Sequence, residues 1–155
     1  MNRRVLIAGV GNVFFGDDGF GVEVVRRLSA EPLPEGVRAL DFGIRGVHLA
    51  FELLEPVDLL VLVDAISRNA RPGTLYLIEP DSESLAGPDC DAHALDPFAV
   101  LSTVQSMGGT LPKTRIVGCE PEDISQGMRL SRTVQSAVGP AISMIHRVLR
   151  DEASC

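Results

Sequence analysis

The chain has 155 residues, a formal net charge of −7 and a mean hydropathy of +0.19, and 45% of its residues are hydrophobic. This length fits one domain, so we expect residues 1–155 to form a single domain, and the apolar content is typical of a globular protein rather than a disordered one. The negative charge argues against nucleic acid and anionic membranes as partners, because both attract basic proteins.

The sequence gives no sign of a signal peptide or of a membrane span. The apolar run that follows Arg4 is too short for a signal peptide, and no apolar stretch approaches the ~18 residues of a spanning helix. The three cysteines, Cys90, Cys119 and Cys155, are odd in number and widely separated. This pattern favours a reducing compartment over a disulfide framework, so we expect a cytoplasmic protein.

The chain opens with a strand, a glycine-rich loop and a helix. Val5–Ala8 is an apolar run typical of a buried strand, and apolar residues recur at helical spacing from Phe20 to Leu28. The loop between them carries the adjacent acids Asp17 and Asp18. Such a unit is where α/β proteins usually place their ligands.

Strands and helices alternate along the rest of the chain. The predicted strands are Val37–Phe42, Asp58–Val63, Thr74–Ile78 and Arg115–Gly118. The predicted helices are Val47–Leu54, Pro97–Met107 and a last helix that Ser131 caps and that runs to Leu149. The apolar stripe of the first of these helices is Val47, Ala50, Phe51 and Leu54. Asp58–Val63 is nearly all apolar, which indicates a central strand. The turn before Thr74–Ile78 is too short for a crossover helix, so that strand should run antiparallel to its predecessor.

This alternation predicts an α/β fold, a three-layer α/β/α sandwich with a mostly parallel, mixed central sheet of about five strands. Ligands of such sheets bind beyond the carboxyl ends of the strands. Asp17, Asp18 and Asp64 follow strand ends, and His93 lies in a loop that can fold over the same edge. Two carboxylates and an imidazole can bind a divalent metal. Each also has a structural interpretation, since Asp17 and Asp64 can cap a helix or turn and His93 can be an exposed loop residue.

A dinucleotide site is an alternative for the first loop. Gly9-Val10-Gly11 resembles the start of the dinucleotide-binding fingerprint, and Asp41 ends the next strand, where an acid could bind a ribose. The third glycine, however, should fall at position 14, which is Phe14. Two carboxylates near the start of the helix would also repel a pyrophosphate. A nucleotide-binding α/β enzyme therefore stays a second hypothesis.

Nucleophilic catalysis and a resident catalytic zinc have little support. The sequence contains no G-x-S-x-G elbow and no H-E-x-x-H helix. Cys90 and His93 have C-x-x-H spacing, but no second pair completes a zinc site. His48 and His146 are interpreted as surface or packing residues. We expect the protein to resist serine- and cysteine-directed inhibitors.

Taken together and in this order, the motifs resemble the maturation endopeptidases of nickel-iron hydrogenases. The resemblance covers nearly the whole chain. Its motifs are GVGNVFFGDDGFG at Gly9–Gly21, DFGIRG at Asp41–Gly46, LLVLVDAI at Leu59–Ile66, the loop histidine His93, and GCEP at Gly118–Pro121. The resemblance implies an enzyme that removes a C-terminal peptide from the hydrogenase large-subunit precursor after nickel insertion.

The resemblance also implies a site. The metal-contacting and catalytic positions of the family fall on Asp18, Asp64 and His93, with nickel presented by the substrate and not held tightly by the isolated protein. Asp17 is the neighbouring alternative to Asp18, and Asp17→Asn is expected to cost mainly helix capping, about 1 kcal/mol. Whether the metal or an acid activates water stays open. A non-catalytic nickel-binding chaperone is a third hypothesis, and we expect a monomer.

Overall fold

The computed structural model describes residues 3–44, 46–80, 97–108 and 111–153. One five-stranded sheet runs through the molecule in the order β2-β1-β3-β5-β4. The strands are β1 (Val5–Val10), β2 (Val37–Gly43), β3 (Leu59–Ala65), β4 (Leu75–Ile78) and β5 (Lys113–Cys119). The helices are the 3-10 turn η1 (Gly16–Gly19), α1 (Phe20–Ser29), α2 (Gly46–Glu52), α4 (Pro97–Ser106) and α5 (Arg132–Ala153).

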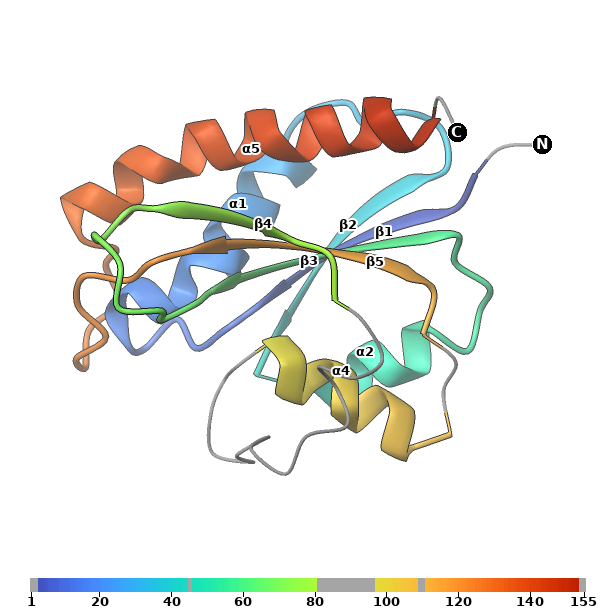
Figure 1. Ribbon diagram of the computed structural model, residues 1–155, viewed down its shortest axis with the longest axis horizontal. Coiled ribbons are helices and arrows are strands. Elements are labelled where there is room, and N and C mark those ends of the chain that lie inside the picture. Colours follow the sequence, from blue (N-terminus) through green and yellow to red (C-terminus); the bar gives the residue numbers. More distant parts are fainter. Residues whose placement is uncertain (1–2, 45, 81–96, 109–110, 154–155) are drawn as a thin grey trace.

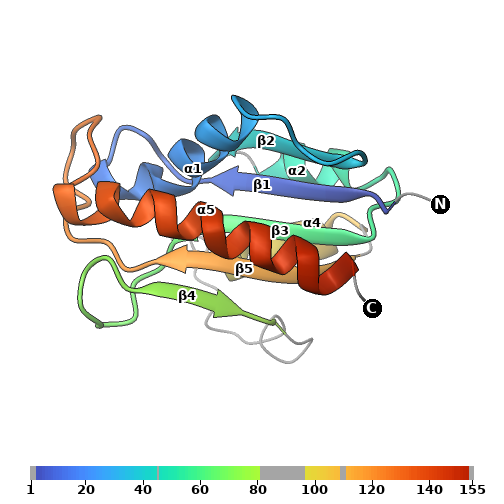
Figure 2. The same cartoon turned by 90° about the horizontal axis from the view of Figure 1, so that it is seen from above.

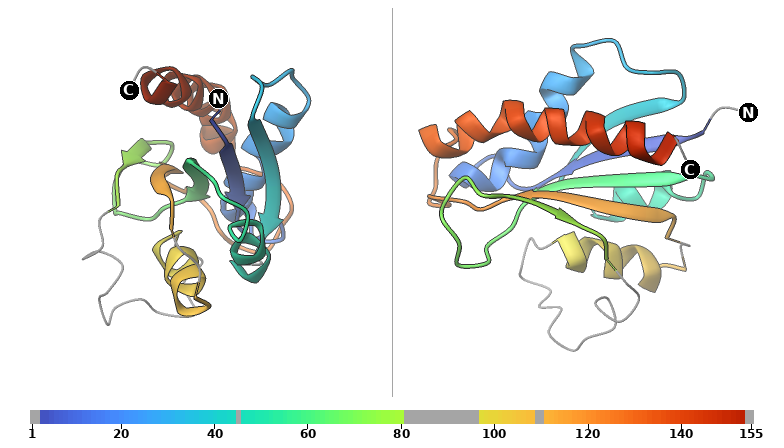
Figure 3. Two further views of the ribbon diagram at one scale, coloured as in Figure 1. Left: turned by 90° about the vertical axis from the view of Figure 1, so that its right-hand side faces the viewer. Right: turned by 45° about the horizontal axis from the view of Figure 1, so that its top comes forward.

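The helices cover both faces of the sheet. α1 and α5 lie on one face and α2 and α4 on the other, as Figures 1 and 3 show. β3 is the central strand, and all seven of its residues are buried, as expected for a parallel strand covered by helices on both sides. The predicted three-layer α/β/α sandwich with a mixed, mostly parallel sheet is therefore confirmed.

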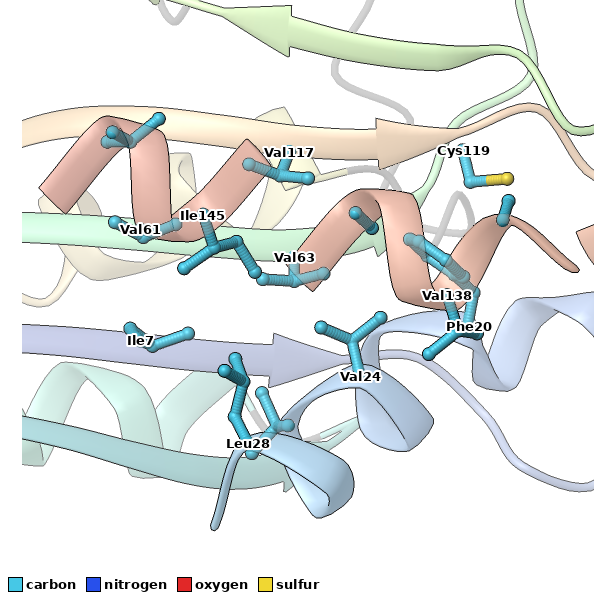
Figure 4. Close-up of a cluster of buried hydrophobic side chains, with 14 of the residues drawn as sticks. Ile7, Phe20, Val24, Leu28, Val61, Val63, Val117, Cys119, Val138 and Ile145 are labelled. Carbon is cyan, nitrogen blue, oxygen red and sulfur yellow. The ribbon is translucent and has the colours of Figure 1, made fainter. Parts of the chain in front are cut away.

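Alternation along the strands divides the apolar core into two clusters, one on each face. Val61 and Val63 point into the cluster under α1 and α5, and Leu60 and Leu62 point into the cluster over α2 and α4. Figure 4 shows the first cluster, in which Ile145 of α5 lies over the sheet.

Two of the expected details differ from the structure. β4 does run antiparallel, but it pairs with β5, which lies between it and β3. The predicted stripe on α2 is partly wrong, because Phe51 and Leu54 are exposed, whereas Leu49 and Leu53 are buried. The helix ends at Glu52, so helical spacing no longer decides which residues beyond it face the sheet.

The parallel strands β1, β3 and β5 all end at the same edge of the sheet, at the left of Figure 2. The start of α1 packs tightly against this edge. A Cβ atom on Gly21 would lie 2.1 Å from the carbonyl oxygen of Val63 and 2.6 Å from that of Val10. Only glycine fits this approach, so the loop before α1 is held directly over the ends of β1 and β3.

Candidate active site

Asp64 lies at the carboxyl end of the central strand. It is the penultimate residue of β3, pairs in register with Gly118 of β5, and is fully buried. Its Oδ1 accepts a hydrogen bond of 2.8 Å from the N–H of Ala65. The strand and the neighbouring backbone N–H therefore hold this carboxylate in one orientation.

Gly11 brings the first loop against Asp64. Its φ of +135° suits glycine, and its N–H donates to the carbonyl of Gly43 at 2.8 Å. A Cβ at this position would lie 1.9 Å from the carbonyl oxygen of Asp18 and 3.4 Å from Oδ1 of Asp64. The backbone carbonyl of Asp18 and the carboxylate of Asp64 therefore both lie close to Gly11, so these two predicted residues are neighbours at this edge of the sheet.

Asp18 is half-buried in η1, and its Oδ2 accepts a hydrogen bond of 2.8 Å from the N–H of Asn12. Burial raises the pKa of the Asp18 carboxyl, and the Asn12 N–H offsets part of this rise. No Lys or Arg of the described ranges forms an ion pair with Asp18. A half-buried carboxylate without a basic partner gains charge compensation when a cation binds.

Asp17 has a different role from the predicted helix cap. Neither η1 nor α1 has a side-chain cap, and the Asp17 side chain is fully buried. Its Oδ2 accepts from the N–H groups of Glu122 and Asp123 at 2.8 and 2.9 Å and from Ser131 Oγ at 2.8 Å, and its Oδ1 accepts from the Ser131 N–H at 2.6 Å. Asp17 thus ties the first loop to the segment between β5 and α5. The expected cost of about 1 kcal/mol for Asp17→Asn is therefore too small.

Ser131 was predicted to cap the last helix, and it does. Its Oγ accepts from the N–H of Val134 at 3.3 Å while donating to Asp17. The start of α5 is therefore built into the same hydrogen-bonded network as η1.

Glu120 is a third buried acid at this edge, and the sequence reasoning missed its role. It accepts hydrogen bonds from Tyr76 Oη at 2.7 Å and from the N–H groups of Arg68 and Ala70 at 2.8 and 3.2 Å. Burial on its own would raise the pKa of Glu120, but these donors outweigh it and hold that pKa below the ordinary value. The available signal was its place directly after a strand end and before Pro121.

Cys119 is buried at the end of β5, near Phe20 and Val138 in Figure 4. Burial, together with the nearby charges of Asp17 and Glu120, raises the pKa of its thiol to about 12. The thiolate is the nucleophilic form, so Cys119 is unsuited to nucleophilic catalysis.

Most amides of the first loop, which a phosphate would need free, already have acceptors within the protein. The N–H groups of Gly11 and Asn12 donate to Gly43 and Asp18. Those of Phe14, Gly16, Asp17 and Asp18 also have acceptors within the protein. This geometry argues against the nucleotide hypothesis.

The predicted histidines fall in different places. His93, like Cys90, lies outside the described residues. His48 is exposed, and His146 is half-buried beside a hollow of about 440 Å³ at the opposite end of the sheet. Within the described ranges, no three His, Cys, Asp or Glu side chains gather into a metal site.

Fold and site together define an α/β protein with buried carboxylates at the carboxyl edge of a mostly parallel sheet. Residues 22–148 match the family model described as hydrogenase maturation protease. The chain therefore belongs to the hydrogenase maturation protease family, and the predicted family and peptidase class are confirmed.

Individual relatives agree. The chain is 33% identical to the hydrogenase expression/formation protein HupD of Rhodobacter capsulatus, over 96% of this chain and 72% of the relative. It is 31% identical to the hydrogenase 2 maturation protease of Escherichia coli, over 96% and 92%. The fold is similar to the hydrogenase maturating endopeptidase HybD from E. coli, with a TM-score of 0.80, 30% identity and coverage of 96% and 93%. It is also similar to the [NiFe] hydrogenase maturation protease HycI from Thermococcus kodakarensis, with a TM-score of 0.75, 26% identity and coverage of 95% and 92%.

Within the described ranges, no helix is both long and apolar enough to cross a membrane.

Proposed function

We propose that this protein removes a C-terminal peptide from the large-subunit precursor of a nickel-iron hydrogenase, and that nickel carried by the precursor is what its site recognises. The observation that supports the proposal is that the backbone of Asp18 and the carboxylate of Asp64 both lie next to Gly11 at the carboxyl edge of the sheet. Family membership supplies the reaction class, which is peptide hydrolysis during hydrogenase maturation.

Each residue has a role in the proposal. Asp64 and Asp18 offer carboxylate oxygens to a metal that the precursor already holds, and His93 adds an imidazole. Carboxylate and imidazole are suitable ligands for a first-row divalent metal. The metal is part of the substrate, so its contribution is to place the precursor in register for cleavage.

The direct test is incubation of the protein with nickel-loaded and nickel-free precursor, followed by intact mass measurement of the precursor. We expect loss of a short C-terminal fragment from the loaded form alone. Binding without loss of mass would instead indicate the non-catalytic chaperone, and equal cleavage of both forms would contradict recognition of nickel.

Three variants test the residues. Asp18→Asn and His93→Ala should nearly abolish cleavage while circular dichroism shows an intact fold. His48→Ala is the matched control for His93→Ala, because His48 is exposed and outside the proposed site. A folded His93→Ala protein that cleaves at the normal rate would remove His93 from the proposal.

A further inference from the structure

Exposed apolar side chains gather on two loops beside the candidate site. The described residues include nine large hydrophobic side chains that are exposed, and four of them belong to these loops. Phe14 and Phe15 precede η1, with exposed fractions of 58% and 44%, and Ile124 and Met128 lie between β5 and α5, with 57% and 71%. We call these four residues the paired-loop surface. Such clustering on a protein surface marks interaction sites.

The two loops form one ordered scaffold. Phe15 and Gly127 form a parallel β-bridge. The N–H of Gly16 donates to the carbonyl of Gly127 at 2.8 Å, and the N–H of Gly127 donates to the carbonyl of Phe14 at 2.8 Å. Figures 1 and 2 show the loops side by side at the edge of the sheet where β1 and β5 end. The apolar side chains are therefore displayed on hydrogen-bonded backbone.

The buried carboxylate of Asp17 locks this scaffold. It joins η1 to the segment between β5 and α5 through four hydrogen bonds, three from the backbone N–H groups of Glu122, Asp123 and Ser131 and one from the Ser131 hydroxyl. The N–H of Asp17 also donates to the carbonyl of Asp123 at 2.9 Å. A surface fixed in advance loses less conformational entropy when a partner binds.

The charge around the surface is negative. Glu122 and Asp123 are exposed beside Ile124, and Asp18 lies three residues from Phe15. Within residues 11–19 and 120–132, all of which the structure describes, the five acids Asp17, Asp18, Glu120, Glu122 and Asp123 outnumber the two basic residues Arg129 and Arg132. A partner that suits both properties carries apolar side chains together with Lys or Arg.

We propose that the paired-loop surface docks an apolar, basic segment of the hydrogenase precursor and so delivers the cleavage region to Asp18 and Asp64. The inference rests on the proposed function, because it takes the precursor as substrate. It adds the surface that selects the precursor and the chemistry of the segment that fits it. Contacts made equally in the bound substrate and in the transition state change KM rather than kcat.

The test uses the double variant Phe14→Ser/Met128→Ser with nickel-loaded precursor. We expect KM to rise by about 10-fold or more, as for truncation of central interface residues, with kcat unchanged. Leu54→Ser is the matched control, because Leu54 is as exposed as Met128, at 71%, but lies in the turn before β3 at the other end of the sheet. Leu54→Ser should leave KM unchanged.

A second test addresses the charge of the surface. We expect KM of the wild type to rise with ionic strength, and Glu122→Gln to raise KM by about 2-fold.

The outcomes separate this inference from the proposed function. If the wild type fails to cleave loaded precursor, the proposed function fails. If the wild type cleaves and the double variant has a normal KM, docking at this surface alone is wrong. A fall in kcat at constant KM would also overturn docking, because it would assign these residues to the chemical step. Concentration-dependent dimers that the double variant abolishes would show that a second copy covers the surface, and would overturn the inference too.

Discussion

Buried acids at the two ends of the sheet have different kinds of partner: basic side chains at the amino end, and N–H and O–H groups at the carboxyl end. At the amino end, the Glu152 carboxylate forms ion pairs with Lys113 at 2.7 Å and Arg115 at 2.9 Å, and Arg3 donates to the Glu152 carbonyl. At the carboxyl end, Asp17 and Glu120 are held by N–H and O–H donors, and no ion pair to either acid occurs within the described ranges.

The two ends therefore differ in net charge: the negative charge of the buried acid is cancelled at the amino end and kept at the carboxyl end. Cations at the amino end cancel the charge of Glu152. Hydrogen-bond donors at the carboxyl end stabilise carboxylates but leave their net charge in place. The edge that carries Asp18 and Asp64 therefore keeps a negative potential, which attracts a metal or a basic segment of a partner.

The largest expected effect comes from neutralising Asp64. The Asn side chain has nearly the same shape, and its Oδ1 can still accept from the N–H of Ala65, so Asp64→Asn should stay folded. If Asp64 is the metal ligand that we propose, loss of its charge should lower kcat/KM by about 100-fold or more, since changes to residues that only support a metal ligand commonly cost 10–100-fold. The measurement is the rate of processing of nickel-loaded precursor, with circular dichroism as the fold control. A normal rate would remove the carboxyl edge from the mechanism.

The second prediction tests whether amide donors hold the carboxyl edge together. Asp17→Asn places an NH₂ group among four donors, so at least one of them loses its acceptor. Hydrogen bonds to charged groups contribute about 1.5–3 kcal/mol, and we expect a loss of about 3 kcal/mol in the free energy of unfolding, measured by denaturant titration.

Glu122→Gln is the control for Asp17→Asn. Its exposed carboxylate accepts one long bond of 3.3 Å from Thr133, so its free energy of unfolding should change by less than about 0.5 kcal/mol. If Asp17→Asn were equally mild, Asp17 would not be the clamp that the hydrogen bonds indicate.

Asp17 also shows where sequence reasoning reaches its limit. Local rules relate a helix-start acid to amides within its own first turn, but the actual partners of Asp17 are 105 to 114 residues away. Glu120 was missed for the same reason, since Arg68 is 52 residues away. Only the folded chain brings these groups together.

The strands and Asp64 could be predicted because their signals are local. A short, unbroken apolar run such as Leu59–Val63 is typical of a strand covered on both faces, and an acid at the end of such a strand is expected at the ligand-binding edge of a parallel sheet. The α2 stripe failed at Leu54 because the helix ends at Glu52, and at Phe51 because the buried positions of this helix are Leu49 and Ala50, a face that Phe51 does not share. His93 lies in a predicted loop without apolar periodicity, so no local sequence signal predicts where it lies relative to the strand ends.

The third prediction concerns the amino end. The ion pair with Lys113 lowers the pKa of Glu152 below its ordinary value, against the effect of burial, and Arg115 and Arg3 add to the lowering. A pKa that is lower in the folded state stabilises the protein above the unfolded value, about 4.5, and this stabilisation is lost as the pH falls through the folded pKa.

Glu152→Gln should therefore lower the free energy of unfolding by about 2 kcal/mol at neutral pH, and the difference from the wild type should shrink in acid. Denaturant titrations of both proteins across this pH range measure it. The rate of precursor processing should not change, because Glu152 lies at the opposite end of the sheet. A constant difference at every pH would show that packing, and not charge, explains the loss.

The smallest expected effect is that of Cys119→Ala, which tests whether cleavage depends on the carboxylates at this edge or on a cysteine thiol. Burial raises the pKa of the Cys119 thiol to about 12, so at neutral pH almost no thiolate is present. The native protein should resist alkylation at Cys119 and react there after unfolding, as read by mass measurement.

In the Cys119→Ala variant, removing the sulfur leaves a small cavity in the core, and we expect the free energy of unfolding to fall by about 1 kcal/mol. Precursor processing should continue at the wild-type rate, because the thiol neither faces solvent nor carries charge. A folded Cys119→Ala protein that no longer cleaves would restore the thiol as a catalytic group and would make the carboxylates its support.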